Sequence, residues 1–126
     1  MNLLKSLTVL FMMCIVIACT NQPNEEEIIK KNITSYLAAI ESGTISEMIK
    51  YADDVRFPSK QDQKNEYENI QDDISETSLE KLVKITKTEY HAIIKYKQNN
   101  RDSTEITLPV IKKDDGWKII VGEDIK

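Results

Sequence analysis

The side chains that could carry out catalysis are one histidine, five tyrosines and three pairs of adjacent aspartates. Histidine suits proton transfer near neutral pH. In the strand expected around it, however, His91 alternates away from Tyr90 and Ala92 and shares a face with Lys95 and Lys97. We therefore interpret His91 as a solvent-facing strand residue rather than a catalytic base.

Four of the tyrosines fall at expected core positions and form a candidate pocket: Tyr36, Tyr51, Tyr90 and Tyr96. Asp53 or Asp54 would lie near the mouth of this pocket. A tyrosine hydroxyl and a carboxylate can together stabilise an enolate, so the set is a candidate for isomerase or hydrolase chemistry. The competing interpretation is that these tyrosines are ordinary core residues whose hydroxyls reach the rim.

Motifs for other reactions are absent from the sequence. It has no serine–histidine–acid signature, no H-E-x-x-H motif and, with three glycines in all, no glycine-rich phosphate loop. The aspartate pairs at 53–54, 72–73 and 114–115 lack the alternating ligands of a calcium loop. We therefore predict no metal and no cofactor, and we interpret the first and third pairs as caps and turns.

Cys19 is the residue with the most specific chemistry. It ends the run Val16-Ile17-Ala18-Cys19, which resembles a bacterial lipobox. Residues 7–17 before it form an uncharged run of signal-peptide size, too short to cross a bilayer. The resemblance implies cleavage between Ala18 and Cys19 and a diacylglycerol on the Cys19 sulfur. The alternatives are a plain secretory signal cut near Ala18 and an uncut membrane anchor.

The lipobox predicts a domain organisation and a location. Residues 1–18 would be a signal peptide, residues 19–24 a lipidated tether, and residues 25–126 a single domain. The protein would then be held on a bacterial membrane by the lipid on Cys19. We expect the outer membrane if the cell has one, because threonine follows the cysteine, and otherwise the outer face of the cell membrane.

Charge is distributed unevenly along the chain. Residues 20–76 carry a net charge of −7, and residues 77–126 a net charge of +2. An acidic first half argues against nucleic acid as a partner, since nucleic-acid binding needs a basic surface. It leaves open an interaction with a protein partner, whose binding would weaken steeply with salt.

Apolar spacing and capping residues predict three helices in the first half. The first helix is expected over residues 24–42, which have one apolar face. Asn24 and Glu27 form its capping pair, and Gly43 stops it. A second helix starts at Thr44 with another capping box and ends at the aspartate pair 53–54. Residues 55–58 are expected to be extended, and a weakly amphipathic surface helix follows from Ser59 to about residue 74.

The second half predicts four strands in an antiparallel meander. Apolar residues alternate at 79–85, 90–96, 106–110 and 117–121, with turn residues between them. Short loops would pair Ile94 with Ile106 and Ala92 with Leu108. Pro109 cannot donate to a strand ladder, so we expect a bulge or a break there.

This order of elements resembles the nuclear-transport-factor-two-like (cystatin-like) families, which include small bacterial lipoproteins of unknown function. The resemblance lies in residues 33–43 (ITSYLAAIESG), in the second helix over residues 45–53, and in the closing hairpin over residues 106–121 with DGWK at 115–118. It implies an α+β fold in which N-terminal helices pack on a curved antiparallel sheet of about four strands. Enzymes of this kind place acids, tyrosines or histidines inside the cone, whereas others bind small apolar ligands or dimerise through the sheet.

Three functions therefore follow as expectations. The leading one is a membrane-anchored, non-catalytic module that binds a small apolar ligand, or a protein partner through the sheet face with Ile93, Ile111 and Ile120. That partner could be a second copy of the same chain, giving a homodimer. The second is an isomerase or hydrolase that uses a buried tyrosine and a carboxylate. The third is an immunity-type lipoprotein that blocks a protein partner with its acidic half.

Overall fold

The computed structural model describes residues 24–70, 72–123 and 125. Ala18 and Cys19 lie outside the described residues. Among the helices described, none is long and apolar enough to span a membrane.

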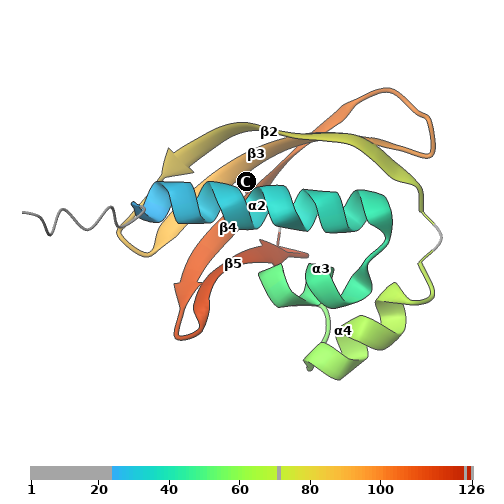
Figure 1. Cartoon of the computed structure of the whole chain (residues 1–126), viewed down its shortest axis with the longest axis horizontal. Helices are drawn as coiled ribbons and strands as arrows, with labels where there is room; N and C mark the ends of the chain where they lie inside the picture. The colour runs from blue at the N-terminus through green and yellow to red at the C-terminus, as the bar shows by residue number, and fades with distance from the viewer. Residues whose placement is uncertain (1–23, 71, 124, 126) are drawn as a thin grey trace, which may run out of the picture.

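In the described part of the chain, two helices lie on one face of a five-stranded sheet and a third packs beside them near one edge of the sheet (Figure 1). The helices are α2 (Glu25–Ser42), α3 (Ile45–Tyr51) and α4 (Lys60–Tyr67). The strands are β1 (Ala52–Asp54), β2 (Ile74–Lys84), β3 (Glu89–Gln98), β4 (Thr104–Lys113) and β5 (Gly116–Val121). Their order is β1-β5-β4-β3-β2, and only β1 runs parallel to its neighbour. The predicted α+β class is confirmed.

The long helix α2 begins and ends as its sequence predicts. The Asn24 side chain accepts a hydrogen bond of 2.8 Å from the Glu27 amide, and three glutamates occupy the first turn, where the helix dipole favours negative charge. Gly43 ends the helix in the left-handed conformation at φ +72°, which glycine adopts without strain. The buried face of α2 packs on the sheet through Ile29, Ile33 and Leu37.

The chain after α2 differs from its prediction in two details. Thr44 precedes α3 but makes no capping hydrogen bond, and its hydroxyl instead lies 2.8 Å from that of Ser42. The expectation that Asp53 and Asp54 end this helix is wrong, because α3 ends at Tyr51 and both aspartates belong to β1. Ala52 is fully buried and pairs with Ile119, so the fifth strand forms on contacts distant in sequence.

Residues 55–58 form a turn and are not the extended segment that was expected. The Arg56 amide donates to the Asp54 side chain at 3.1 Å and the Phe57 amide to the Asp54 carbonyl at 3.2 Å, so an aspartate-centred turn overrides the preference set by Pro58. Ser59 caps α4 as predicted, at 3.1 Å from the Asp62 amide. The helix nevertheless ends at Tyr67, and Ile74 already belongs to β2.

The predicted register of the meander is confirmed. Ile94 pairs with Ile106 and Ala92 with Leu108, and Val110 pairs with Ile119 in the closing hairpin. Pro109 pairs with His91 on β3, while the ladder of β4 with β5 starts one residue later, at Val110. The pairing of β4 with β3 thus continues through Pro109 without a bulge, while its pairing with β5 ends at the next residue.

Candidate functional site

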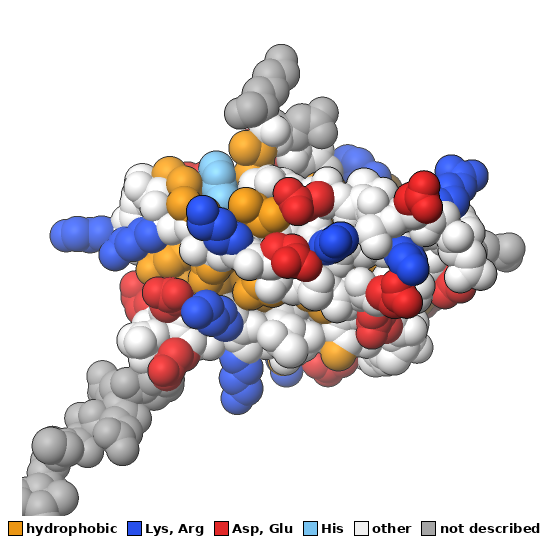
Figure 2. Space-filling model, turned by 90° about the horizontal axis from the view of Figure 1, so that it is seen from above, with side chains coloured by type: hydrophobic (Ala, Val, Ile, Leu, Met, Phe, Trp, Pro, Cys, Tyr) orange, Lys and Arg blue, Asp and Glu red, His pale blue; other side chains and the backbone are white. Residues whose placement is uncertain are grey.

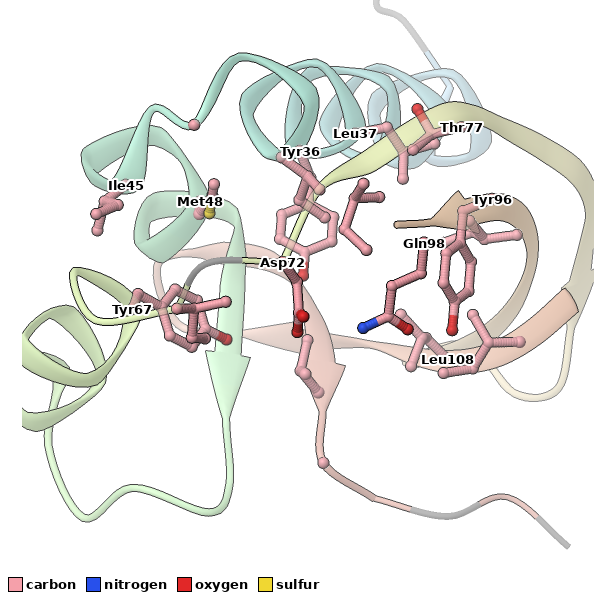
Figure 3. Close-up of a pocket in the computed structure, with 18 of the residues that line it drawn as sticks. Tyr36, Leu37, Ile45, Met48, Tyr67, Asp72, Thr77, Tyr96, Gln98 and Leu108 are labelled. Carbon is pink, nitrogen blue, oxygen red and sulfur yellow. The ribbon is translucent and has the colours of Figure 1, made fainter. Parts of the chain in front are cut away.

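A cavity of about 670 Å³ lies between the helices and the inner face of the sheet (Figure 3). This volume falls within the range of roughly 300–1,000 Å³ that is typical of small-molecule sites. Its lining includes apolar side chains from α2, α3, four strands and the segment after α4: Leu37, Ile40, Ile45, Met48, Ile70, Ile74, Ile94, Ile106, Leu108 and Val121. The curved sheet and the corner between α2 and α3 thus border a largely apolar space that is partly open to solvent.

Tyr36 projects from α2 into this cavity, as Figure 3 shows. The residue is only 6% exposed, and its hydroxyl makes no hydrogen bond to a described residue. Burial, with a smaller effect from the charge of Asp54, raises the pKa of Tyr36 to about 12. The hydroxyl therefore stays protonated at neutral pH and is available to a polar atom of a bound molecule.

Asp54 lies behind the cavity wall as the centre of a hydrogen-bond network. Arg56 donates Nε to Oδ1 at 2.8 Å and Nη2 to Oδ2 at 2.6 Å. The Tyr67 hydroxyl donates to Oδ2 at 2.7 Å. Together with the Arg56 amide, these donors fill the roughly four lone-pair positions that a carboxylate offers.

The electrostatics of the network keep Asp54 ionised. Burial alone would raise the pKa of Asp54, but the hydrogen bonds from Arg56 and Tyr67 outweigh it and hold that pKa below its usual value. Burial and the bond to Asp54 raise the pKa of Tyr67. Asp54 is therefore a poor general base, since it is a weak proton acceptor with its oxygens already occupied.

Helix α4 fixes this network to the edge of the sheet. Gln63 is buried, and its amide accepts from the Asp54 amide at 3.4 Å and donates to the Ala52 carbonyl at 3.3 Å. Lys60 donates to the Ala52 carbonyl at 2.7 Å and forms an ion pair with Asp53. This helix lies on the surface, as expected, and also holds β1 in place.

Gly122 lets Arg56 lie across the end of β5. Its φ is +87°, and a Cβ at this position would lie 2.8 Å from Cγ of Arg56. A side chain here would push the arginine away from Asp54. Arg56, Gly122 and Tyr67 all line the cavity, so the network shapes one end of it.

The structure separates the four tyrosines of the candidate pocket. Tyr36 and Tyr96 line the cavity. Tyr51 is partly buried beside the core, and Tyr90 packs edge-to-face on Trp117 with ring centres 5.5 Å apart; neither is among the described residues of the lining. Tyr67 lines the cavity and was not anticipated, because its weakly amphipathic helix gave no signal of a buried role.

The outer face of the sheet holds the remaining candidates. His91 lies there, 3.0 Å from a Glu89 oxygen, and the histidine side chain is visible beside hydrophobic side chains in Figure 2. Ile93 and Ile111 are partly exposed on this face, whereas Ile120 is buried and so is not available to a partner. No group of three or more potential metal ligands occurs among the described residues.

Solved structures with the same arrangement identify the fold. A domain of unknown function with a cystatin-like fold from Nostoc punctiforme superposes with a TM-score of 0.57 and 9% identity, covering 84% of this chain and 81% of that one. The chain has a cystatin-like fold. A ketosteroid isomerase-like protein from Erwinia carotovora atroseptica superposes with a TM-score of 0.53 and 13% identity, covering 78% of this chain and 92% of that one.

These likenesses establish the cystatin-like, nuclear-transport-factor-two-like fold and nothing finer. Comparison of the sequence with protein-family models and with curated proteins finds no match. Proteins with this fold include ligand-binding proteins and isomerases, so the fold does not determine the function and the residues of the cavity must.

Proposed function

We propose that this protein is a non-catalytic module that binds a small, largely apolar molecule in the cavity of its cystatin-like fold. The observation that carries the proposal is the cavity of about 670 Å³, with largely apolar walls and the Tyr36 hydroxyl inside it, which has no partner among the described residues. Apolar walls supply the affinity, and a few converging polar groups fix the orientation of the ligand. Both features are present here.

The geometry argues against Asp53 and Asp54 as the base of an isomerase or hydrolase reaction. Such a reaction needs a carboxylate that can take up and release a proton beside the substrate. Asp54 is held ionised behind the wall by Arg56 and Tyr67, and Asp53 is paired with Lys60. The two aspartates expected at the pocket mouth therefore support the structure rather than provide a base.

Filling the cavity should abolish ligand uptake. Ile40 lines the cavity from α2, and Ile40→Trp places a much larger side chain in it. We expect the affinity for Nile red, an uncharged dye whose emission reports apolar surroundings, to fall at least about tenfold, which corresponds to about 1.4 kcal/mol. Fluorescence titration measures this directly.

The matched control is Ile85→Trp, at an exposed position between β2 and β3. This variant should bind the dye as the parent protein does. Equal binding by the Ile40→Trp variant, with its fold retained by circular dichroism, would show that the dye binds elsewhere and would remove the main support for the proposal.

We also propose that the module is tethered to the cell envelope by lipid on Cys19, as the lipobox-like run predicts. This proposal is based on the sequence of residues 16–19, which follows an apolar segment of signal-peptide size. Each buried methylene contributes about 0.8 kcal/mol, so two or more acyl chains would hold the protein firmly.

Cys19→Ser should release the protein from membranes. We expect the serine variant to move from the membrane pellet to the soluble fraction and to lose incorporation of a fatty-acid analogue. A variant with Cys14→Ser, within the expected signal peptide, serves as the control and should remain in the pellet. Unchanged membrane association of the Cys19 variant would contradict lipid anchoring.

A further inference from the structure

The charged side chains that line the cavity are predominantly acidic. They are Arg56, Glu68, Asp72 and Glu123. Arg56 is bound to Asp54 directly behind the wall, so its charge is largely neutralised. The three acids form no ion pair with a described residue, and the nearest recorded partner is the neutral side-chain amide of Asn99, which donates to Asp72 at 3.3 Å. The charged side chains of the lining are thus net negative.

Two further features of the cavity bear on its ligand. Tyr36 is more than nine-tenths buried, and its hydroxyl points into the cavity without a partner among the described residues, where a polar atom of a bound molecule can reach it. The tyrosines Tyr36, Tyr67 and Tyr96 also line this space. Aromatic faces attract cations, which adds to the effect of the acids.

We propose that the cavity selects cationic amphiphiles: molecules with an apolar body, which lies against the inner face of the sheet, and an amine head, which lies near Glu68, Asp72 and Glu123. This inference rests on the proposed function and narrows it to one ligand class. It excludes fatty acids as the preferred ligands, because their carboxylates would face three acidic side chains and find Arg56 already engaged by Asp54.

A series of matched ligands tests the selection. Decylamine, decanol and decanoate share one chain length and differ in head-group charge at neutral pH. Each is used below its micelle-forming concentration to displace Nile red from the protein. We expect decylamine to bind about tenfold more tightly than decanol, since Glu68, Asp72 and Glu123 are exposed and each exposed charge interaction contributes about 0.2–1 kcal/mol. Decanoate should bind most weakly, and 0.5 M salt should reduce the preference for the amine.

Charge-neutralising variants separate the effect of the three acids in the lining from the effect of the net charge of the whole protein. Combining Glu68→Gln, Asp72→Asn and Glu123→Gln should bring decylamine and decanol to within about threefold of each other. The control combines Glu66→Gln, Asp102→Asn and Glu105→Gln, which remove the same charge from exposed positions outside the described lining. This control should keep the amine preference.

The outcomes distinguish this inference from the proposed function. If decanol binds but decylamine shows no advantage, or if decanoate binds most tightly, the cationic selection is wrong and the cavity remains a binding site. If the lining and control variants lose the preference equally, the selection comes from overall charge and the inference fails. If none of the three ligands displaces the dye, both proposals fail.

Discussion

Asp54→Asn is expected to lower the free energy of unfolding by about 2–3 kcal/mol. The carboxylate of Asp54 is buried and accepts hydrogen bonds from Arg56 and Tyr67, and an amide in its place would point hydrogens at these donors. Loss of a partner from a fully buried ion pair costs about 3–5 kcal/mol; the value here should be smaller because the Arg56 side chain is 57% exposed. Urea denaturation at pH 7 measures the difference.

The neighbouring substitution Asp53→Asn is the matched control. Asp53 is paired with Lys60 at a partly exposed site, so its loss should cost under about 1 kcal/mol. Equal effects of the two substitutions would show that the network around Asp54 has no special role in stability.

The effect of Asp54→Asn should also depend on pH in a defined direction. Because the pKa of Asp54 in the folded state lies below its ordinary value of 3.8, the stabilisation is fully present above that value and is lost as the pH falls through the folded pKa. The parent and variant should therefore converge in acid. A difference in unfolding free energy that stays constant from pH 7 to pH 3 would contradict the assignment.

Ile33→Ala is expected to cost about 3 kcal/mol. Ile33 is 0% exposed in the centre of the contact between α2 and the sheet, and removing buried methyl and methylene groups there loses transfer energy and leaves a cavity. Thermal or urea denaturation measures the loss. The fold should survive with lowered stability, because neighbouring core residues remain in place.

The control for this change lies on the same helix. Ile28 is 37% exposed, so Ile28→Ala should cost under about 1 kcal/mol. If Ile28→Ala were as damaging as Ile33→Ala, the buried face of α2 would have been assigned to the wrong side.

Features that depend on neighbouring residues could be predicted from the sequence. The cap at Asn24, the stop at Gly43 and the apolar spacing of α2 act within one or two turns of helix. The pairing of Ile94 with Ile106 follows because a one-residue slip would reverse the two faces of the strand. These local rules gave the α+β class and the meander.

Features that depend on distant residues could not be predicted. Strand β1 exists because Ala52 is buried against Ile119, and a three-residue segment carries no periodic signal of its own. The role of Tyr67 depends on Asp54, thirteen positions earlier, and on the turn that joins them. The sequence therefore predicted a pocket lined by tyrosines with an aspartate nearby. It did not predict which tyrosine contacts the aspartate.

The central claim, that a small apolar molecule occupies the cavity, is tested most directly by methyl NMR of isoleucine-labelled protein. Isoleucines line the cavity at Ile40, Ile45, Ile70, Ile74, Ile94 and Ile106, and others lie outside the described lining at Ile85, Ile93 and Ile111. On titration with decanol, we predict saturable shifts confined to the first group. Shifts confined to the second group, or no saturable shift at all, would contradict the account.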